Sequence, residues 1–141
     1  MVLVDTSVWI HADKRPESAE ARELDALLQQ DQVATTDLVI AEVLQGSSSA
    51  SHFQENADKM EALHYFHAAR ETWLKAAELS FQLMRSGLTT PLSDLVVATV
   101  AMEAGLIVYT TDQHFSRVPG LHSHQSSLTA ASGSEPGQTN E

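Results

Sequence analysis

Short runs of consecutive apolar residues alternate with helix-like segments along most of this chain, and this alternation limits the folds available to it. The clearest runs are Val2–Val4 and Leu106–Tyr109, where apolar residues follow one another without polar interruption. Such runs are typical of strands buried on both faces, as in parallel sheets whose crossover helices cover each side. The sequence therefore predicts an α/β fold around a short parallel sheet.

Helical periodicity and local start and stop signals place the connecting helices. One helix is expected to open at Pro16, because proline is favoured at the first helical position. The last is expected to begin at Thr90-Pro91 and to end at Gly105, because glycine commonly follows a helix C-terminus. The remaining helices are expected at about 7–12, between a Thr36 cap and Gly46, at 53–64 and at 69–86, with weaker strands just before Thr36, near 65–66 and near 121–123.

The end of the sequence differs in composition from the rest. Residues 126–141, SSLTAASGSEPGQTNE, contain too few apolar side chains to form a core. We therefore expect one folded domain over residues 1–125 and a disordered tail over residues 126–141. A chain of 141 residues is long enough for one such domain to bury a sizeable core.

Composition excludes several classes of protein. The sequence has no cysteine, which excludes a disulfide scaffold or thiolate metal site and fits a cytoplasmic location. No apolar run approaches the roughly 18 residues of a membrane span, so no membrane association is expected. The net charge of −11 disfavours broad electrostatic binding of nucleic acid. Formal charge overstates the working charge, however, if some of the acids hold a cation.

Four acidic residues lie where the pattern predicts at least partly buried surroundings. Asp5 and Asp112 each follow an expected strand, and the carboxyl ends of parallel strands meet at one edge of the sheet. Glu42 shares a largely apolar helix face, and Asp94 lies in the first turn of a helix that is apolar nearly all round. If the two strands are neighbours, these carboxylates are expected to lie close together.

Each acid taken alone also has an ordinary structural explanation, such as capping a helix, forming a turn or pointing into water. Burying several unpaired carboxylates together costs several kcal/mol each, and no basic residue lies near them in sequence. A divalent cation would resolve this conflict. Oxygen ligands without cysteine or a histidine pair favour Mg²⁺, with Mn²⁺ as a substitute. A histidine metal site is not expected, because the pairs at 64/67 and 122/124 lack a third ligand.

The segments VDTSVWI, AEVLQG, PLSDLVVATVAMEAGLIVYTTDQHF and VPGL resemble, in order and spacing, the motifs of PIN-domain nucleases. More narrowly, they resemble the VapC toxins of bacterial and archaeal toxin–antitoxin pairs, from Val2 to about His122. The resemblance implies an α/β/α sandwich around the parallel sheet. It also implies that the acidic cluster of the family consists here of Asp5, Glu42, Asp94 and Asp112.

The same resemblance implies a function: a Mg²⁺-dependent endoribonuclease toxin with an RNA substrate, a VapB-like antitoxin and a homodimeric state. Such a cation activates water and neutralises charge on the phosphate. We expect Asp5 and Asp94 to be direct ligands, Asp112 to complete the set and Glu42 to bind through water or accept a proton. Arg85 is a candidate contact to phosphate. Some relatives carry a fifth acid at the position of His114.

Hydroxyl groups and apolar stripes add further expectations. The hydroxyls expected to support the carboxylates are those of Thr6, Ser7, Ser93 and Thr110. The antitoxin is expected to dock on apolar stripes of two helices, formed by Leu24, Leu27 and Leu28 and by Phe53, Met60 and Leu63.

Two other functions remain open. A phosphatase similar to haloacid dehalogenases would also carry a strand-end aspartate like that of VLVDTS. Such enzymes need a second aspartate two residues later, where this chain has Ser7. A catalytically silent PIN-like binding module is the other alternative, and the four intact acids argue against it.

Overall fold

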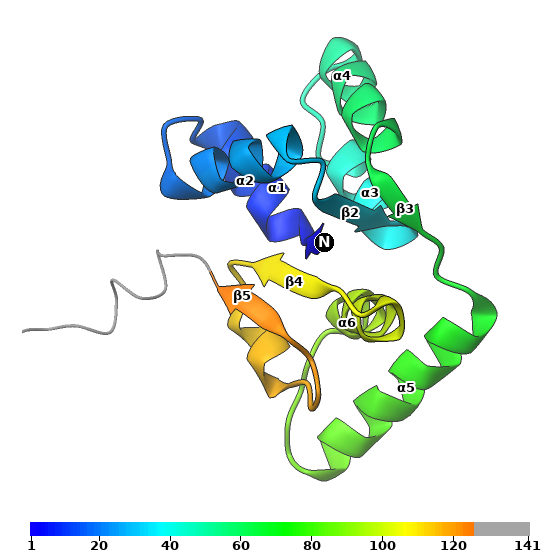
Figure 1. Cartoon of the computed structure of the whole chain (residues 1–141). Helices are drawn as coiled ribbons and strands as arrows, with labels where there is room; N and C mark the ends of the chain where they lie inside the picture. The colour runs from blue at the N-terminus through cyan, green and yellow to red at the C-terminus, as the bar shows by residue number, and fades with distance from the viewer. Residues whose placement is uncertain (126–141) are drawn as a thin grey trace, which may run out of the picture.

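A five-stranded parallel sheet forms the centre of the computed structural model, which describes residues 1–125 (Figure 1). The tail expected over residues 126–141 lies outside the described residues. The strand order is β3-β2-β1-β4-β5, so β1 is the central strand and its neighbours are β2 and β4. The strands are β1 (Val2–Val4), β2 (Val33–Thr36), β3 (His64–Phe66), β4 (Ile107–Thr110) and β5 (Ser123–Gln125).

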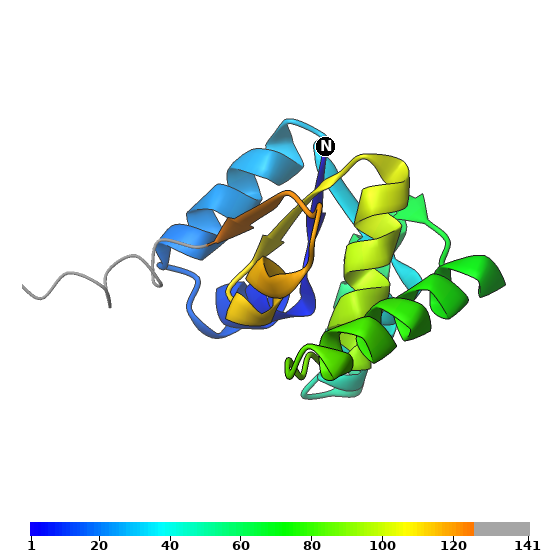
Figure 2. The same ribbon diagram turned by 90° about the horizontal axis from the view of Figure 1, so that it is seen from below.

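Helices connect successive strands and cover both faces of the sheet. Figure 2 shows α2 on one side of the sheet and α6 on the other, which confirms the expected α/β/α sandwich. The helices are α1 (Thr6–Lys14), α2 (Ala19–Gln29), α3 (Asp37–Gln45), α4 (Ala50–Glu61), α5 (Arg70–Arg85) and α6 (Leu92–Ala104), followed by the short 3₁₀ helix η1 (Gln113–Arg117). No helix within residues 1–125 is long and apolar enough to cross a membrane.

The composition of α6 follows from its position between the sheet and α5. Every residue from Leu95 to Ala101 is buried, and α5 packs against α6 on its outer side (Figure 2). Full burial of each Val or Leu side chain contributes roughly 1.5–3 kcal/mol, so this helix is a major part of the core. Gly105 ends it as expected, with a left-handed φ of 66°. The rigid helix fixes Asp94 in its first turn.

The expected start of the second helix was wrong. Residue Pro16 does not open α2, which begins at Ala19 after Ser18 as its N-cap. The Ser18 hydroxyl accepts a hydrogen bond of 3.1 Å from the Ala21 N–H, and this cap outweighs the preference of proline for a first turn. Similarly, Ser49 caps α4 at Ala50, three residues before the expected start.

Candidate metal centre at the carboxyl edge of the sheet

Asp5 is buried at the point where β1 ends and α1 begins, with 6% of the residue exposed. Its Oδ2 accepts hydrogen bonds from the hydroxyls of Ser7, at 2.7 Å, and Thr110, at 3.0 Å. Burial raises the pKa of Asp5, and these hydrogen bonds, with smaller effects from the Thr6 and Ser7 amides, oppose the rise. The hydroxyls of Ser7 and Thr110, more than capping of α1, therefore account for the orientation of this carboxylate.

Two hydroxyl groups hold the ends of β1 and β4 together beneath this edge. The Ser7 Oγ lies 3.3 Å from the Thr110 Oγ1 and accepts a hydrogen bond from the Thr111 N–H. Thr110 also accepts one from the Asp112 N–H, at 2.9 Å. The network therefore fixes the backbone at Asp112 relative to the carboxylate of Asp5. Ser93 takes no part in it among the described residues.

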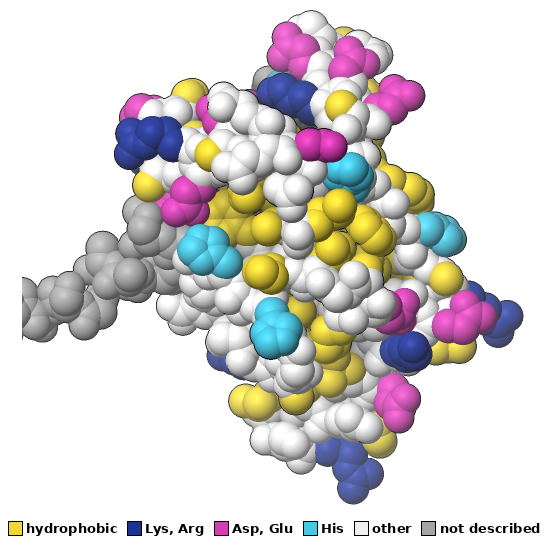
Figure 3. Space-filling view, in the orientation of Figure 1, with side chains coloured by type: hydrophobic (Ala, Val, Ile, Leu, Met, Phe, Trp, Pro, Cys, Tyr) yellow, Lys and Arg dark blue, Asp and Glu magenta, His cyan; other side chains and the backbone are white. Residues whose placement is uncertain are grey.

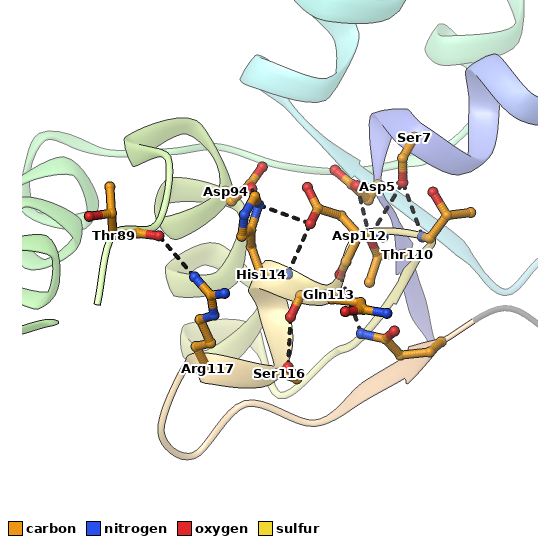
Figure 4. Close-up of polar contacts among 12 residues, drawn as sticks. Asp5, Ser7, Thr89, Asp94, Thr110, Asp112, Gln113, His114, Ser116 and Arg117 are labelled. Atoms are coloured by element: carbon orange, nitrogen blue, oxygen red, sulfur yellow. Dashed lines mark hydrogen bonds and ion pairs between the residues drawn. The ribbon is translucent and has the colours of Figure 1, made fainter. Parts of the chain in front are cut away.

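A second group of side chains comes from α6 and η1. The ligand atoms of Asp94, Asp112 and His114 all lie within 4.8 Å of one another (Figure 4). His114 Nδ1 is 2.9 Å from Asp112 Oδ1 and 3.6 Å from Asp94 Oδ2. Asp112 also caps η1, because its Oδ1 accepts a hydrogen bond of 2.9 Å from the His114 N–H. Its capping role and its place in the cluster are therefore compatible.

Electrostatics couple these carboxylates into one site. The pKa of Asp94 is raised from 3.8 to about 7, first by burial and then by repulsion from Asp112 and Asp5. Among the described residues, its buried Oδ2 has no hydrogen-bond partner. An acid with these surroundings is only partly ionised at neutral pH unless a cation compensates its charge.

Glu42 approaches the cluster from α3 and is half-buried. Burial raises its pKa, and repulsion from Asp5 raises it further, while the Thr6 hydroxyl lowers it. Glu42 therefore does not point freely into water. The group of three closest ligand atoms includes neither Glu42 nor Asp5, so both carboxylates lie beside that group and are coupled to it or to each other through charge.

Asp37 provides a comparison within the same sheet edge, because it follows β2 just as Asp5 follows β1. It accepts hydrogen bonds from the Tyr65 hydroxyl and from the Ala68 N–H at 2.7 Å, and His67 Nδ1 lies 3.1 Å from it. Burial opposes a lower pKa, yet these partners lower it. The carboxylate of Asp37 therefore has hydrogen-bond partners within the fold, whereas the Oδ2 atom of Asp94 has none among the described residues.

Two arginines, Arg85 and Arg117, are the basic residues considered as phosphate contacts. Arg85 lies in the last turn of α5 with its guanidinium 5.6 Å from the centroid of the Phe81 ring. Within the described residues it forms no ion pair with the acids, and its contact with phosphate remains a prediction. Arg117, in η1, donates a hydrogen bond of 3.1 Å to the Thr89 carbonyl beside the cluster (Figure 4). Its nearness to the site was not anticipated from the sequence.

Histidine was also missed as a member of this cluster. The histidine pairs at 64/67 and 122/124 do not include His114, so the expected ligands were all oxygen. The available signal was its position only two residues after Asp112. The donor set fits a divalent cation, because the buried Asp94 oxygen accepts no hydrogen bond among the described residues and its ionised form, beside Asp112, needs positive charge.

The sequence matches a known protein family over most of its length. The family model described as "PIN domain" matches residues 2–121. The chain is 34% identical over 122 residues to Ribonuclease VapC18 of Mycobacterium tuberculosis, covering 84% of this chain and 87% of that relative. It is 32% identical over 130 residues to Ribonuclease VapC5 of the same organism, covering 86% of this chain and 90% of that relative.

A solved structure shares the fold. The crystal structure of VapBC2 from Rickettsia felis, bound to a DNA fragment from its promoter, contains a chain with a TM-score of 0.75 to this one. The two chains are 21% identical, and the match covers 89% of this chain and 99% of that one. The helices and strands described above are therefore arranged as in that chain.

Proposed function

This chain belongs to the PIN-domain family and to its VapC ribonucleases, and from this premise we propose that it is an endoribonuclease toxin of a type II toxin–antitoxin system. The proposed activity is hydrolysis of RNA phosphodiester bonds in the cytoplasm with a divalent cation, Mg²⁺ or Mn²⁺. The observation that carries the proposal is the buried Oδ2 of Asp94, which accepts no hydrogen bond within the described residues and is repelled by the carboxylates of Asp112 and Asp5. Neither a phosphatase nor a silent binding module gains support from these contacts.

The proposed roles follow from the position of each side chain. Asp5, Asp94 and Asp112 would hold the cation, which when bound supplies charge neutralisation at the phosphate and activation of water. Ser7 and Thr110 orient the Asp5 carboxylate through their hydrogen bonds to its Oδ2. Because that oxygen already accepts two hydrogen bonds, its partner Oδ1 is the freer atom for the site.

Glu42 has a different proposed role, that of proton acceptor. Its carboxylate is half-buried next to Asp5, and both burial and that neighbour raise its pKa. A more basic carboxylate takes a proton from water more readily than an ordinary one does. We therefore place proton transfer from the attacking water on a carboxylate oxygen of Glu42.

RNA binding must depend on a few local contacts. On the face shown in Figure 3, Lys and Arg side chains are scattered among acidic and neutral ones and form no continuous basic surface. The net charge of −11 likewise disfavours a long electrostatic footprint. We propose that Arg85 and Arg117 contact phosphate near the cluster, and that the substrate is a single-stranded or loop RNA.

The proposed antitoxin site is a groove with a volume of about 650 Å³ between helices α1 to α4. Leu24, Leu28 and Leu63 line it, as expected from the apolar stripes of these helices. Three other members of those stripes do not line it: Leu27 and Met60 pack in or against the core, and Phe53 is exposed outside the groove. A helix of a VapB-like antitoxin would place its apolar face in such a groove.

The proposed homodimer has a separate candidate surface on α5. Several large apolar side chains on this helix are about half exposed, which is unusual for a surface helix without a partner. They are Trp73, Leu74, Phe81 and Met84.

The experiment that tests the proposed function is RNA cleavage by the purified, antitoxin-free chain. Cleavage should require Mg²⁺ or Mn²⁺ and should stop on addition of EDTA. Asp5→Asn and Asp94→Asn should each abolish it, while Asp58→Asn, at an exposed position on α4, should not. Cleavage that survives both substitutions in correctly folded protein would contradict the proposal.

A further inference from the structure

The imidazole of His114 faces the two carboxylates that come from α6 and the start of η1 (Figure 4). Its Nδ1 lies 2.9 Å from Asp112 Oδ1 and 3.6 Å from Asp94 Oδ2. Both Nδ1 and the Asp94 Oδ2 are buried atoms, and within the described residues neither makes a directed hydrogen bond. A nitrogen and an oxygen therefore face the same space, each without a well-oriented partner.

Contacts on both sides of His114 position it next to the two acids. The His114 N–H donates to Asp112 Oδ1, so the backbone of the histidine is fixed to one of the acids it faces. The next residue, Phe115, is 1% exposed and anchors η1 in the core. On the other side, α6 fixes Asp94 through its buried residues. The backbone that carries the ring is thus fixed beside both acids, although 39% of the His114 side chain is exposed.

An imidazole differs from a carboxylate in the metals it favours. Mg²⁺ is a hard cation that binds oxygen and keeps its waters, whereas first-row transition-metal dications accept nitrogen ligands more readily. A carboxylate at position 114 would give an all-oxygen site. The histidine gives a site of mixed oxygen and nitrogen ligands.

We propose that His114 binds the divalent cation through Nδ1 and shifts the selectivity of the site from Mg²⁺ toward Mn²⁺. This inference rests on the proposed function, because it needs a cation held by Asp94 and Asp112. In a simpler alternative, the ring contacts the two acids as an internal counter-ion only while the cation is absent, and does not bind the cation. The two roles differ in whether nitrogen remains in contact with the bound metal.

Pulsed electron paramagnetic resonance on the full chain loaded with Mn²⁺ distinguishes them, because a directly bound nitrogen produces a characteristic nuclear coupling. Wild-type protein should show this coupling, and His114→Asp and His114→Asn should lack it. Calorimetric titration of the metal-free proteins with Mn²⁺ and with Mg²⁺ gives the second readout. In His114→Asp the preference for Mn²⁺ over Mg²⁺ should fall about ten-fold, the usual scale for changes around a metal site. His122→Gln, an exposed histidine, should leave both readouts unchanged.

The outcomes separate this inference from the proposed function. Unchanged Mn²⁺ binding in Asp94→Asn would show that the cation does not occupy the cluster, and the proposed function would fail with the inference. If Asp94→Asn loses Mn²⁺ but the wild-type signal contains no nitrogen coupling, the site stands and His114 is only a counter-ion. An equal metal preference in wild type and His114→Asp would also overturn the inference. The wild-type spectrum decides the question even if the variants fail to fold.

Discussion

The Thr110 hydroxyl donates a hydrogen bond of 3.0 Å to Asp5 Oδ2, joining the ends of β4 and β1 across 105 positions of sequence. The two strands are direct neighbours, with Val4 aligned with Tyr109. Asp5 and Asp112 are therefore brought to the same edge by strand pairing, and Thr110 sets the orientation of one and the backbone of the other. A single buried hydroxyl thus positions two of the proposed ligands.

Thr110→Val should lower both stability and metal affinity. Valine has nearly the same shape but cannot donate to Asp5 or accept from the Asp112 N–H. Leaving such buried groups unsatisfied costs about 1–3 kcal/mol in the free energy of unfolding, measured by urea denaturation. Thr99→Val is the matched control, because that buried hydroxyl bonds only to the Leu95 carbonyl within α6. Equal metal affinity in both variants would contradict the positioning role of Thr110.

The stability of the metal-free protein should depend on pH through Asp94. Its pKa is raised from 3.8 to about 7, so the folded state holds this proton more tightly than the unfolded chain. The resulting stabilisation is complete below about pH 3.8 and is lost as the pH rises to about 7. Raised pKa values make Asp5 and Glu42 act in the same direction.

Thermal melting at several pH values checks this prediction. Asp94→Asn should weaken the pH dependence between about 4 and 7 and should be more stable than wild type at neutral pH. Asp58→Asn, at an exposed position, should keep the wild-type dependence. The prediction fails if the melting temperature of wild type rises across this range and that of Asp94→Asn follows the same curve. Such a result would show that the acids are not packed as described.

Asp37 should behave in the opposite way. Its pKa is lowered by Tyr65, Ala68 and His67, so its contribution is present above its ordinary value of 3.8 and is lost as the pH falls below it. Asp37→Ala should lower the free energy of unfolding by about 1 kcal/mol, the usual net contribution of one hydrogen bond. Tyr65→Phe should lower it by less. Calorimetry should find Mg²⁺ affinity unchanged in both. A loss of affinity in Asp37→Ala would extend the site to β2.

Substitutions in the proposed antitoxin groove should weaken antitoxin binding without affecting ribonuclease activity. Leu28→Asp and Ile10→Asp place charge on two half-exposed side chains that line the groove. Each should keep ribonuclease activity and arrest growth even when a VapB-like antitoxin is co-expressed, whereas wild type should be silenced. Leu74→Asp, on α5, should remain silenced while losing the homodimer in size-exclusion chromatography. Complete silencing of both groove variants would place the antitoxin elsewhere.

Much of the fold could be predicted because its signals are local. Uninterrupted apolar runs indicated strands covered on both faces, and the nearly continuous apolar stretch of α6 after Asp94 indicated a helix enclosed by other layers. The start of α2 could not be predicted, because the preferences of Pro16 and Ser18 compete and only the packed structure decides between them. The order of the strands depends on long-range pairing, which no local pattern encodes.

The candidate site divides in the same way. Asp5, Glu42 and Asp94 stood out because each conflicts with an apolar segment, and Asp112 stood out because it follows an expected buried strand. His114 did not stand out, because a histidine in a short polar segment creates no such conflict. Its contact with Asp94 depends on η1 packing against α6, residues that lie 20 positions apart in the chain. Their joint position became visible only with the tertiary structure.

The central claim is that Asp5, Asp94 and Asp112 together hold a divalent cation. Anomalous diffraction from crystals soaked in Mn²⁺ tests it most directly, because the signal locates the metal without reference to activity. We expect an anomalous peak within coordinating distance of the Asp94 carboxylate in wild type and no such peak in Asp94→Asn. A peak only at another acidic surface, or one that persists unchanged in Asp94→Asn, would contradict it.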